Sequence, residues 1–367
     1  MKKRAKLLRE LRRARESAAG RIARVSEYFA QRRRDRTFGA DLCDYAGGRA
    51  FQPKVALLLI WQPDGLAGSI LATCRHLHAC GYAPLVVSNG ALCGDDHARL
   101  LPLVWRLIER PNLGHDFGGY RDGIMLLQKY ERHPERLVIL NDSIWFPLQE
   151  NCDLLARLEH APGHDGFSGA AWMERPGRAH RAHFQSYFLM FGPRALGHPA
   201  FMQFWRRYPV SSRRSSVLLH GEKGLSRAMM QAGLVAPALL SPVLMMQQAE
   251  NMSTAGLCKV LEYAALTDPD MIAARDRILG DAATETARPA LLRLVERSVM
   301  NGHFVETHPY LAAQVLGFHF LKKRKDATGI EGRRQVLRAL QAGDMPVPQT
   351  VMMDEIQTHD RQNASTC

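Results

Sequence analysis

The chain has 367 residues, of which 46% are hydrophobic and 23% are charged, a balance typical of a globular protein and not of a disordered one. This length allows one large domain or two modest ones. The formal net charge is +13, but residues 1–36 hold 14 Lys and Arg against 4 Asp and Glu, so they carry +10 and the rest of the chain carries only +3.

Residues 1–36 form the first predicted unit, a basic arm. Apolar residues recur there at steps of three and four, and Arg and Lys cover much of the rest, which is typical of an amphipathic helix. The apolar positions are Leu7, Leu11, Ala14, Ala18, Ile22, Val25 and Phe29. Such a helix can lie on an anionic membrane surface, or it can pack on the body of the protein. Nucleic-acid binding is a weaker alternative, because no stacking aromatics are interleaved with the cations.

Residues 50–250 form the second predicted unit, in which short apolar runs alternate with helical stretches. Strands are predicted over residues 55–61, 85–88, 107–110, 136–140 and 183–191, and helices over 66–79, 95–107 and 120–129. This alternation predicts an α/β fold, a mostly parallel sheet flanked by helices. Ligands of such sheets bind at the carboxyl ends of the strands. The loops expected to meet there are residues 62–65, 89–90, 112–119 and 141–143.

Residues 251–341 are predicted to form a helical region. Its helices are expected over residues 271–279, 290–299 and 310–322. Residues 342–367 contain Pro and Gln and are weakly patterned, so we expect a flexible tail.

The cellular compartment of the protein is predicted from features that the sequence lacks. The longest apolar run, residues 55–61, is far shorter than the roughly 20 residues of a membrane-spanning helix. The N-terminus has no apolar segment before a cleavage site, so no secretory signal is expected. The seven cysteines show no Cys-x-x-Cys spacing, which argues against disulfides and against a structural zinc site. We therefore expect a cytoplasmic protein.

The glycine-rich residues 111–123 are the first candidate for chemistry. Their glycines allow sharp turns and close approach to a ligand, and Asn112 and Asp116 are able to hydrogen-bond sugar hydroxyls. The spacing matches neither a dinucleotide-binding loop nor a P-loop. A turn followed by a helix cap is the alternative.

Two acidic residues are the other candidates. Asp142 follows the apolar run 137–140, where a carboxylate can hold a divalent cation that bridges a diphosphate, although a hydrogen-bonding role is equally compatible with one carboxylate. Glu222 precedes a helical stretch, where it is either a general base that takes a proton from an acceptor hydroxyl or an acid that stabilises a helix N-terminus.

Taken together, residues 53–325 resemble the rhamnan synthesis protein F family of bacterial polysaccharide glycosyltransferases. Residues 183–191, with the sequence HFQSYFLMF, are the most specific match. The other matching segments are Val55–Trp61 with Pro63 and Asp64, Asn112–Gly119, Leu140–Ser143, Phe204 with Trp205, Gly221–Ser226, His308 with Pro309, and Gly317–Lys322. Two positions depart from the family pattern: His115 stands where Arg is usual, and His319 where Pro is common.

The resemblance implies a GT-A-like enzyme that moves a deoxyhexose, L-rhamnose from dTDP-L-rhamnose, onto a lipid-linked glycan such as O-antigen or capsule. It implies Glu222 as the base of an inverting reaction and Asp142 as a catalytic residue that holds Mg²⁺ or Mn²⁺. The substrate-binding residues that it implies are Asp64, Asn112, Gly114, Asp116, Asn141, Ser143, His183, Gln185 and Ser186. A lipid-linked acceptor would place the protein at the inner face of the plasma membrane. A non-catalytic sugar- or nucleotide-binding subunit is the alternative, since residues 141–143 carry one acid.

Overall fold

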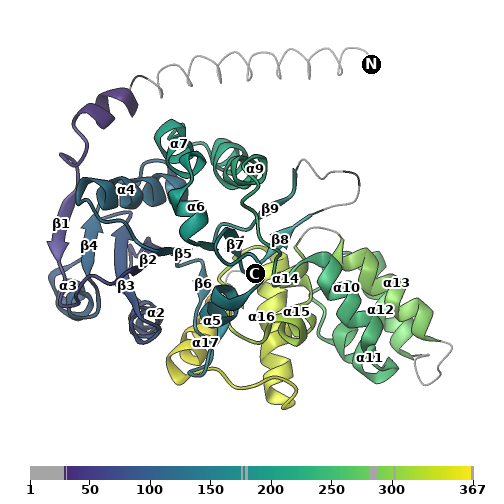
Figure 1. Ribbon diagram of the computed structural model, residues 1–367. Helices are drawn as coiled ribbons and strands as arrows, with labels where there is room; N and C mark the ends of the chain where they lie inside the picture. The colour runs from purple at the N-terminus through teal and green to yellow at the C-terminus, as the bar shows by residue number, and fades with distance from the viewer. Residues whose placement is uncertain are drawn as a thin grey trace, which may run out of the picture.

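The computed structural model describes residues 29, 31–174, 177, 181–280, 287–300 and 303–364, and Figure 1 shows how the elements are arranged. A seven-stranded sheet forms the centre. Its strands, in order across the sheet, are β1 (Cys43–Ala46), β4 (Arg106–Glu109), β3 (Tyr82–Ser88), β2 (Lys54–Ile60), β5 (Arg136–Asn141), β10 (Phe188–Phe191) and β7 (Phe167–Gly169). Strands β4, β3, β2 and β5 are parallel, whereas β1 and β10 are antiparallel to their neighbours. The predicted mostly parallel α/β sheet is therefore confirmed.

Helices cover both faces of this sheet because its central strands are apolar on both sides. In β2, alternate side chains enter two different hydrophobic clusters. One set is Ala56, Leu58 and Ile60, and the other is Val55, Leu57 and Leu59. The first cluster includes α2 (Gly68–Ala79), and the second includes α4 (His115–Lys129) and α7 (Pro199–Arg207). Helix α3 (Gly94–Leu100) with the 3₁₀ turn Leu101–Leu103, α5 (Leu154–His160) and α6 (Pro193–Gly197) complete the connections.

The glycines of α4 let this helix lie close to the sheet. A Cβ on Gly119 would lie 2.2 Å from Leu59 Cδ1, and a Cβ on Gly118 would lie 2.1 Å from the carbonyl oxygen of Leu113. The helix starts at His115, five residues before the predicted start, because Gly114 adopts a left-handed conformation (φ 79°) and ends the preceding loop. Most of these glycines thus serve packing, whereas the sequence had suggested approach to a ligand.

Two other predicted elements are divided in the structure. Residues 183–191 form β9 (His183–Phe184), which pairs with β8 (Trp172–Met173), and then β10 in the main sheet. Residues 310–322 form α15 (Pro309–Leu316), which ends at Gly317 (φ 90°), and then β11 (Leu321–Lys322). Strand β11 pairs with β6 (Ile144–Trp145) just beyond the end of β5.

The C-terminal part is helical as predicted, but its end is ordered. Its helices are α10 (Pro242–Asn251), α11 (Thr254–Glu262), α12 (Pro269–Gly280), α13 (Arg288–Val299), α14 (Phe304–Thr307), α16 (Ala327–Gln341) and α17 (Thr350–Ala364). The expected flexible tail is wrong for α17, because Met352 and Ile356 are fully buried and Glu355 accepts hydrogen bonds from the Ser69 amide (2.7 Å) and Trp145 Nε1 (3.0 Å). The predicted boundary at residue 250, between the α/β unit and the helical region, stays a prediction.

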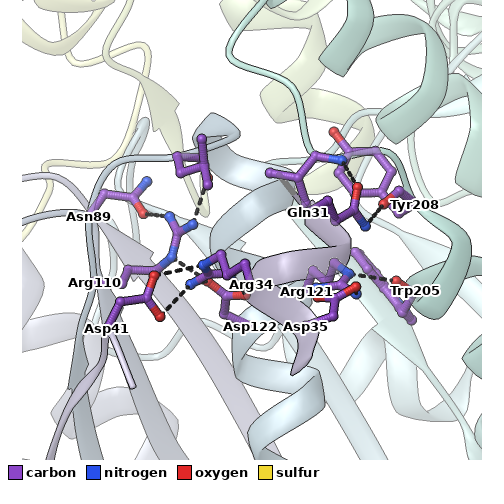
Figure 2. Close-up of polar contacts among 12 residues, drawn as sticks. Gln31, Arg34, Asp35, Asp41, Asn89, Arg110, Arg121, Asp122, Trp205 and Tyr208 are labelled. Carbon is purple, nitrogen blue, oxygen red and sulfur yellow. Dashed lines mark hydrogen bonds and ion pairs between the residues drawn. The ribbon is translucent and has the colours of Figure 1, made fainter. Parts of the chain in front are cut away.

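The end of the basic arm docks on α4 (Figure 2). Residues 31–36 are helical. Arg34 forms ion pairs with Asp122 (2.7 Å) and Asp41 (2.7 Å), and Arg121 donates to both oxygens of Asp35 (2.9 Å). Asp122 also accepts from Arg110 at 2.6 Å, and neither side chain of this pair is exposed. Asp122 is a buried acid between two cations, and the loss of either cation would leave buried charge poorly compensated. This contact therefore anchors the end of the basic arm to the domain.

For residues 31–36 the structure therefore favours packing on the body over membrane contact. Gln31 adds to the docking, since its Nε2 donates to the Tyr208 carbonyl (2.8 Å) and its Oε1 accepts from the Val210 amide (2.9 Å) (Figure 2). The earlier part of the predicted amphipathic helix lies outside the described residues. Within the part that the structure describes, no helix is long and apolar enough to cross a bilayer.

We predict that Gly118→Ala destabilises the protein by about 1–3 kcal/mol, because the added methyl meets backbone and cannot be relieved by a rotamer change. Gly94→Ala is the matched control, since nothing lies within 4 Å of its Cβ position. Urea denaturation of both variants measures the difference. Equal free energies of unfolding for both variants would contradict the close approach of α4 to the loop before it.

Candidate active site

A cleft of about 990 Å³ opens beyond the carboxyl end of β5, at the large end of the range for ligand sites. It is lined by the strand ends, the start of α4, the turn between β9 and β10, and the segment after β11. Seven of the eleven residues implied by the resemblance line it. These are Asp116, Asn141, Ser143, His183, Gln185, Ser186 and Glu222.

Asn141 organises the floor of this cleft. Its Nδ2 donates to Asp116 Oδ2 (3.0 Å), and its Oδ1 accepts from the Ser143 amide (3.2 Å) and the Ser143 hydroxyl (2.5 Å). The last residue of β5 and the first turn of α4 are thereby joined. The strand-end rule thus brings residues 116 and 141–143 together as expected.

Asp116 is the carboxyl with the most altered titration in the cleft. Burial, together with the nearby carboxylates of Asp142 and Glu222, raises its pKa to about 6, while His115 and the hydrogen bond from Asn141 oppose the rise. Its protonated form is therefore favoured up to mildly acidic pH.

Glu222 also lines the cleft, at the end of a π-helical turn (Val217–Glu222) that leads into α9 (Lys223–Gln231). Its Oε1 accepts from the Ser186 amide at 2.7 Å, and its Oε2 lies 3.6 Å from His183 Nε2. Gly221 lets this turn approach α4, since a Cβ there would lie 2.6 Å from the Phe117 ring. The π-turn therefore presents the Glu222 carboxylate to the cleft, as such turns often do at functional sites.

Asp142 lies behind the cleft and is not among its lining residues. Its Oδ2 accepts from the Trp61 amide (2.7 Å) and from Gln62 Nε2 (2.7 Å). Burial raises its pKa, and these two donors together with the charge of Lys323 oppose the rise. The carboxylate thus holds the loop after β2 against the end of β5, as a positioning group.

Besides Asp142, three of the implied residues do not reach the cleft. Asp64 and Asn112 are exposed outside it, and Gly114 is buried under Val210, where a Cβ would lie 2.5 Å from that side chain. Asn89, in the expected cleft loop 89–90, instead accepts from the buried Arg110. Of the loops and motif residues expected at one site, Glu222, Asp116 and Asn141 therefore share the cleft, whereas Asn112 and Asp142 do not line it.

The cleft also contains cations that the sequence reading missed. These are Arg181, Arg214, Lys223, Lys322, Lys323, Arg324 and Lys325. The run of four cations at 322–325 was visible in the sequence, but the predicted helix over 310–322 hid its position beside β6.

The side chains around the cleft do not form a set of ligands that fits a divalent cation. No three His, Cys, Asp or Glu side chains cluster suitably anywhere in the described ranges. Asp142 Oδ2 already accepts two hydrogen bonds and Asp142 does not line the cleft, so its carboxylate is not placed to hold a cation on a bound diphosphate. The Mg²⁺ or Mn²⁺ implied by the resemblance therefore has no evident protein ligands at this cleft.

We predict that the stability of Asp116→Asn relative to wild type increases as pH rises. A carboxyl whose folded-state pKa lies above its unfolded value costs stability once it ionises, so wild type loses stability on going from about pH 4 to about pH 7. Asn mimics the neutral form, so the stability of the variant relative to wild type should rise by on the order of 3 kcal/mol over that range. Urea denaturation at several pH values measures it. A difference independent of pH would contradict the raised pKa.

The chain is 28% identical over 316 residues to the uncharacterized protein y4gN of Sinorhizobium fredii (strain NBRC 101917 / NGR234), covering 86% of this chain and 81% of that protein. Among solved structures, the mannosyltransferase PcManGT from Pyrobaculum calidifontis, in complex with GDP-Man and Mn²⁺, aligns over 95% of this chain and 96% of its own at 13% identity, with a TM-score of 0.31. The model of the family "Rhamnan synthesis protein F" matches residues 85–256, and for these residues it confirms the family resemblance indicated by the motifs.

Proposed function

We propose that the protein is a glycosyltransferase of bacterial polysaccharide synthesis, with a nucleotide sugar as donor and a glycan as acceptor. The observation that carries this proposal is the fixed carboxylate of Glu222 in a wide cleft at the strand ends, which Asp116 and Asn141 also line. The family match supports the same class of reaction. The more specific proposal is transfer of L-rhamnose from dTDP-L-rhamnose, as the sequence motifs implied.

In the proposed reaction Glu222 is the general base. The Ser186 amide binds Oε1, which orients the carboxylate and leaves Oε2 near His183 for the acceptor hydroxyl. Glu222 takes the proton, the acceptor oxygen forms a bond to the anomeric carbon, and the bond from that carbon to the diphosphate oxygen breaks with its electrons. One in-line displacement of this kind inverts the configuration at the anomeric carbon.

Asp116 and Asn141 are proposed to bind sugar or ribose hydroxyls at the other side of the cleft. Asp116 accepts from Asn141, so its remaining oxygen is available to a substrate hydroxyl. Gln185 is held by Lys322 Nζ at 3.3 Å and is the next polar group along the wall. The substrate would thus lie between α4 and the turn that separates β9 from β10.

We also propose that the basic arm brings the cleft to a lipid-linked acceptor at the inner face of the plasma membrane. The support is its sequence: cations and apolar residues alternate in residues 1–28 with amphipathic spacing. Residues 31–36 are tied to α4 by ion pairs, so the arm and the catalytic body are joined directly.

We predict that Glu222→Gln lowers kcat for sugar transfer by about 100-fold or more, with donor affinity changed less than about threefold, because Gln keeps the size but cannot accept the proton. Donors would be tested as a panel that includes dTDP-L-rhamnose. Glu296→Gln, on the exposed face of α13, is the matched control. Full transfer by Glu222→Gln would refute the assigned base. A wild-type chain that binds a nucleotide sugar yet never releases nucleoside diphosphate would instead support the non-catalytic binding subunit.

We predict that removing residues 1–28 abolishes flotation with anionic phosphatidylglycerol vesicles, whereas the full chain floats and neither floats with phosphatidylcholine alone. Truncation at 28 keeps the docking contacts of Gln31, Arg34 and Asp35, so loss of binding would not reflect loss of the fold. A full chain with the Lys and Arg of residues 1–28 changed to Gln tests the charge separately. Equal flotation of the full and truncated chains would rule out the membrane role of the arm.

A further inference from the structure

We propose that the basic segment Lys322–Lys325, together with Lys223, binds the diphosphate of the donor and neutralises the leaving group in place of a divalent cation. This inference rests on the proposed function, since it assigns the diphosphate site of the same cleft.

The segment is fixed at the end of β5 by backbone pairing. Leu321 and Lys322 pair with Trp145 and Ile144, and the Lys323 amide donates to the Ser143 carbonyl at 2.7 Å. The basic segment therefore begins directly beside residues 141–143, where the resemblance had placed a metal-binding carboxylate. A cation at this position has the same electrostatic task as a metal ion, which is to stabilise the charge on a departing diphosphate.

Lys322 is the most precisely held of these cations. Its Nζ lies 3.1 Å from Glu306 Oε1 and 3.3 Å from Gln185 Oε1, and it sits 4.3 Å from the centre of the Tyr187 ring. Glu306 is itself buried, and Arg324 lies 3.4 Å from the same oxygen. One buried carboxylate thus positions two cations at the cleft, and Asp326, which accepts from the Arg324 guanidinium, balances the second charge.

Lys323 is a second fixed cation. Its Nζ lies 3.2 Å from Ser69 Oγ and 3.7 Å from Glu355 Oε2, and it stands 5.3 Å from the centre of the Trp145 ring. Burial lowers its pKa, and the charges of Glu355 and Asp142 oppose the fall. Glu355 and Ser69 therefore fix the Lys323 ammonium, while the Lys323 backbone is tied to Ser143.

Some cations of the cleft have no carboxylate partner. Seven Arg and Lys line it against four lining acids, namely Asp116, Glu174, Glu222 and Asp326, and Glu306 and Glu355 also pair with three of these cations. Lys223 and Lys325 form no ion pair with any carboxylate of the described ranges. Lysine binds phosphate as a flexible point charge, and charge-assisted hydrogen bonds to phosphate are strong, so an excess of unpaired cations in a wide cleft fits a diphosphate.

The experiment measures nucleoside diphosphate binding with and without metal. Isothermal titration of the full chain with dTDP, UDP, GDP and inorganic pyrophosphate is run in EDTA and again in Mn²⁺. We expect one of the nucleoside diphosphates to bind in EDTA with an affinity within about threefold of that in Mn²⁺, to bind more tightly than its monophosphate, and to weaken as salt rises.

The variants test the lysines individually. Lys325→Met and Lys223→Met remove cations that lack an ion pair, so the fold should be unaffected, and each should weaken diphosphate binding in EDTA while monophosphate binding changes less. Lys322→Met should weaken it on the order of tenfold or more, and Lys322→Arg should restore part of the loss. Lys129→Met, at the exposed end of α4, is the control for lost charge alone.

The outcomes separate the two proposals. If a nucleoside diphosphate binds only with Mn²⁺, or if Lys325→Met, Lys223→Met and Lys322→Met all bind like wild type, the cationic diphosphate site is refuted while the transferase proposal stands. If no nucleoside diphosphate or nucleotide sugar binds in either buffer, the proposed function itself is overturned. An intact fold of Lys325→Met and Lys223→Met, checked by circular dichroism, keeps these results interpretable even if Lys322→Met unfolds because of Glu306.

Discussion

The pairing of β6 with β11 just beyond the end of β5 is the interaction on which the rest of the site depends. It joins Ile144 and Trp145 to residues nearly 180 positions later in the chain, and the Lys323 amide extends it to the Ser143 carbonyl. This pairing places the basic residues 322–325 at the cleft. The first hydrophobic cluster is continuous from the sheet through Trp145 to Phe304 and Val336, so the C-terminal region and the sheet share one core.

The opposite wall depends on close approach of helices to the sheet. Gly119 and Gly123 let α4 lie against Leu59 and Leu57, and Gly221 lets the π-turn reach α4. These approaches bring Asp116 and Glu222 near enough for each charge to act on the other. The same helix carries Asp122, which holds Arg110 and Arg34 on its far side. Helix α4 thus connects the entry of the basic arm with the floor of the cleft.

The sequence predicted the parallel sheet well because its strands are apolar on both faces and are separated by clear turn signals. Asp116, Asn141 and Glu222 were found because polar residues at strand ends and motif positions meet at one edge of such a sheet. Asn112 was misplaced because the helix begins at His115, so the loop before it points away from the cleft. The flexible tail was wrong because burial of Met352 and Ile356 depends on α2 and Trp145, which no local pattern reveals. The basic wall was missed for the same reason, since only the long-range pairing of β11 brings residues 322–325 to the site.

A crystal structure of the chain with a nucleoside diphosphate bound tests the central claim most directly, because the position of the two phosphates decides between the possible sites. The account predicts phosphate oxygens within hydrogen-bond distance of lysines from residues 322–325, with Glu222 on the other side of the sugar position. Phosphates bound outside the cleft, or bridged to Asp142 by a metal with the lysines turned away, would contradict it.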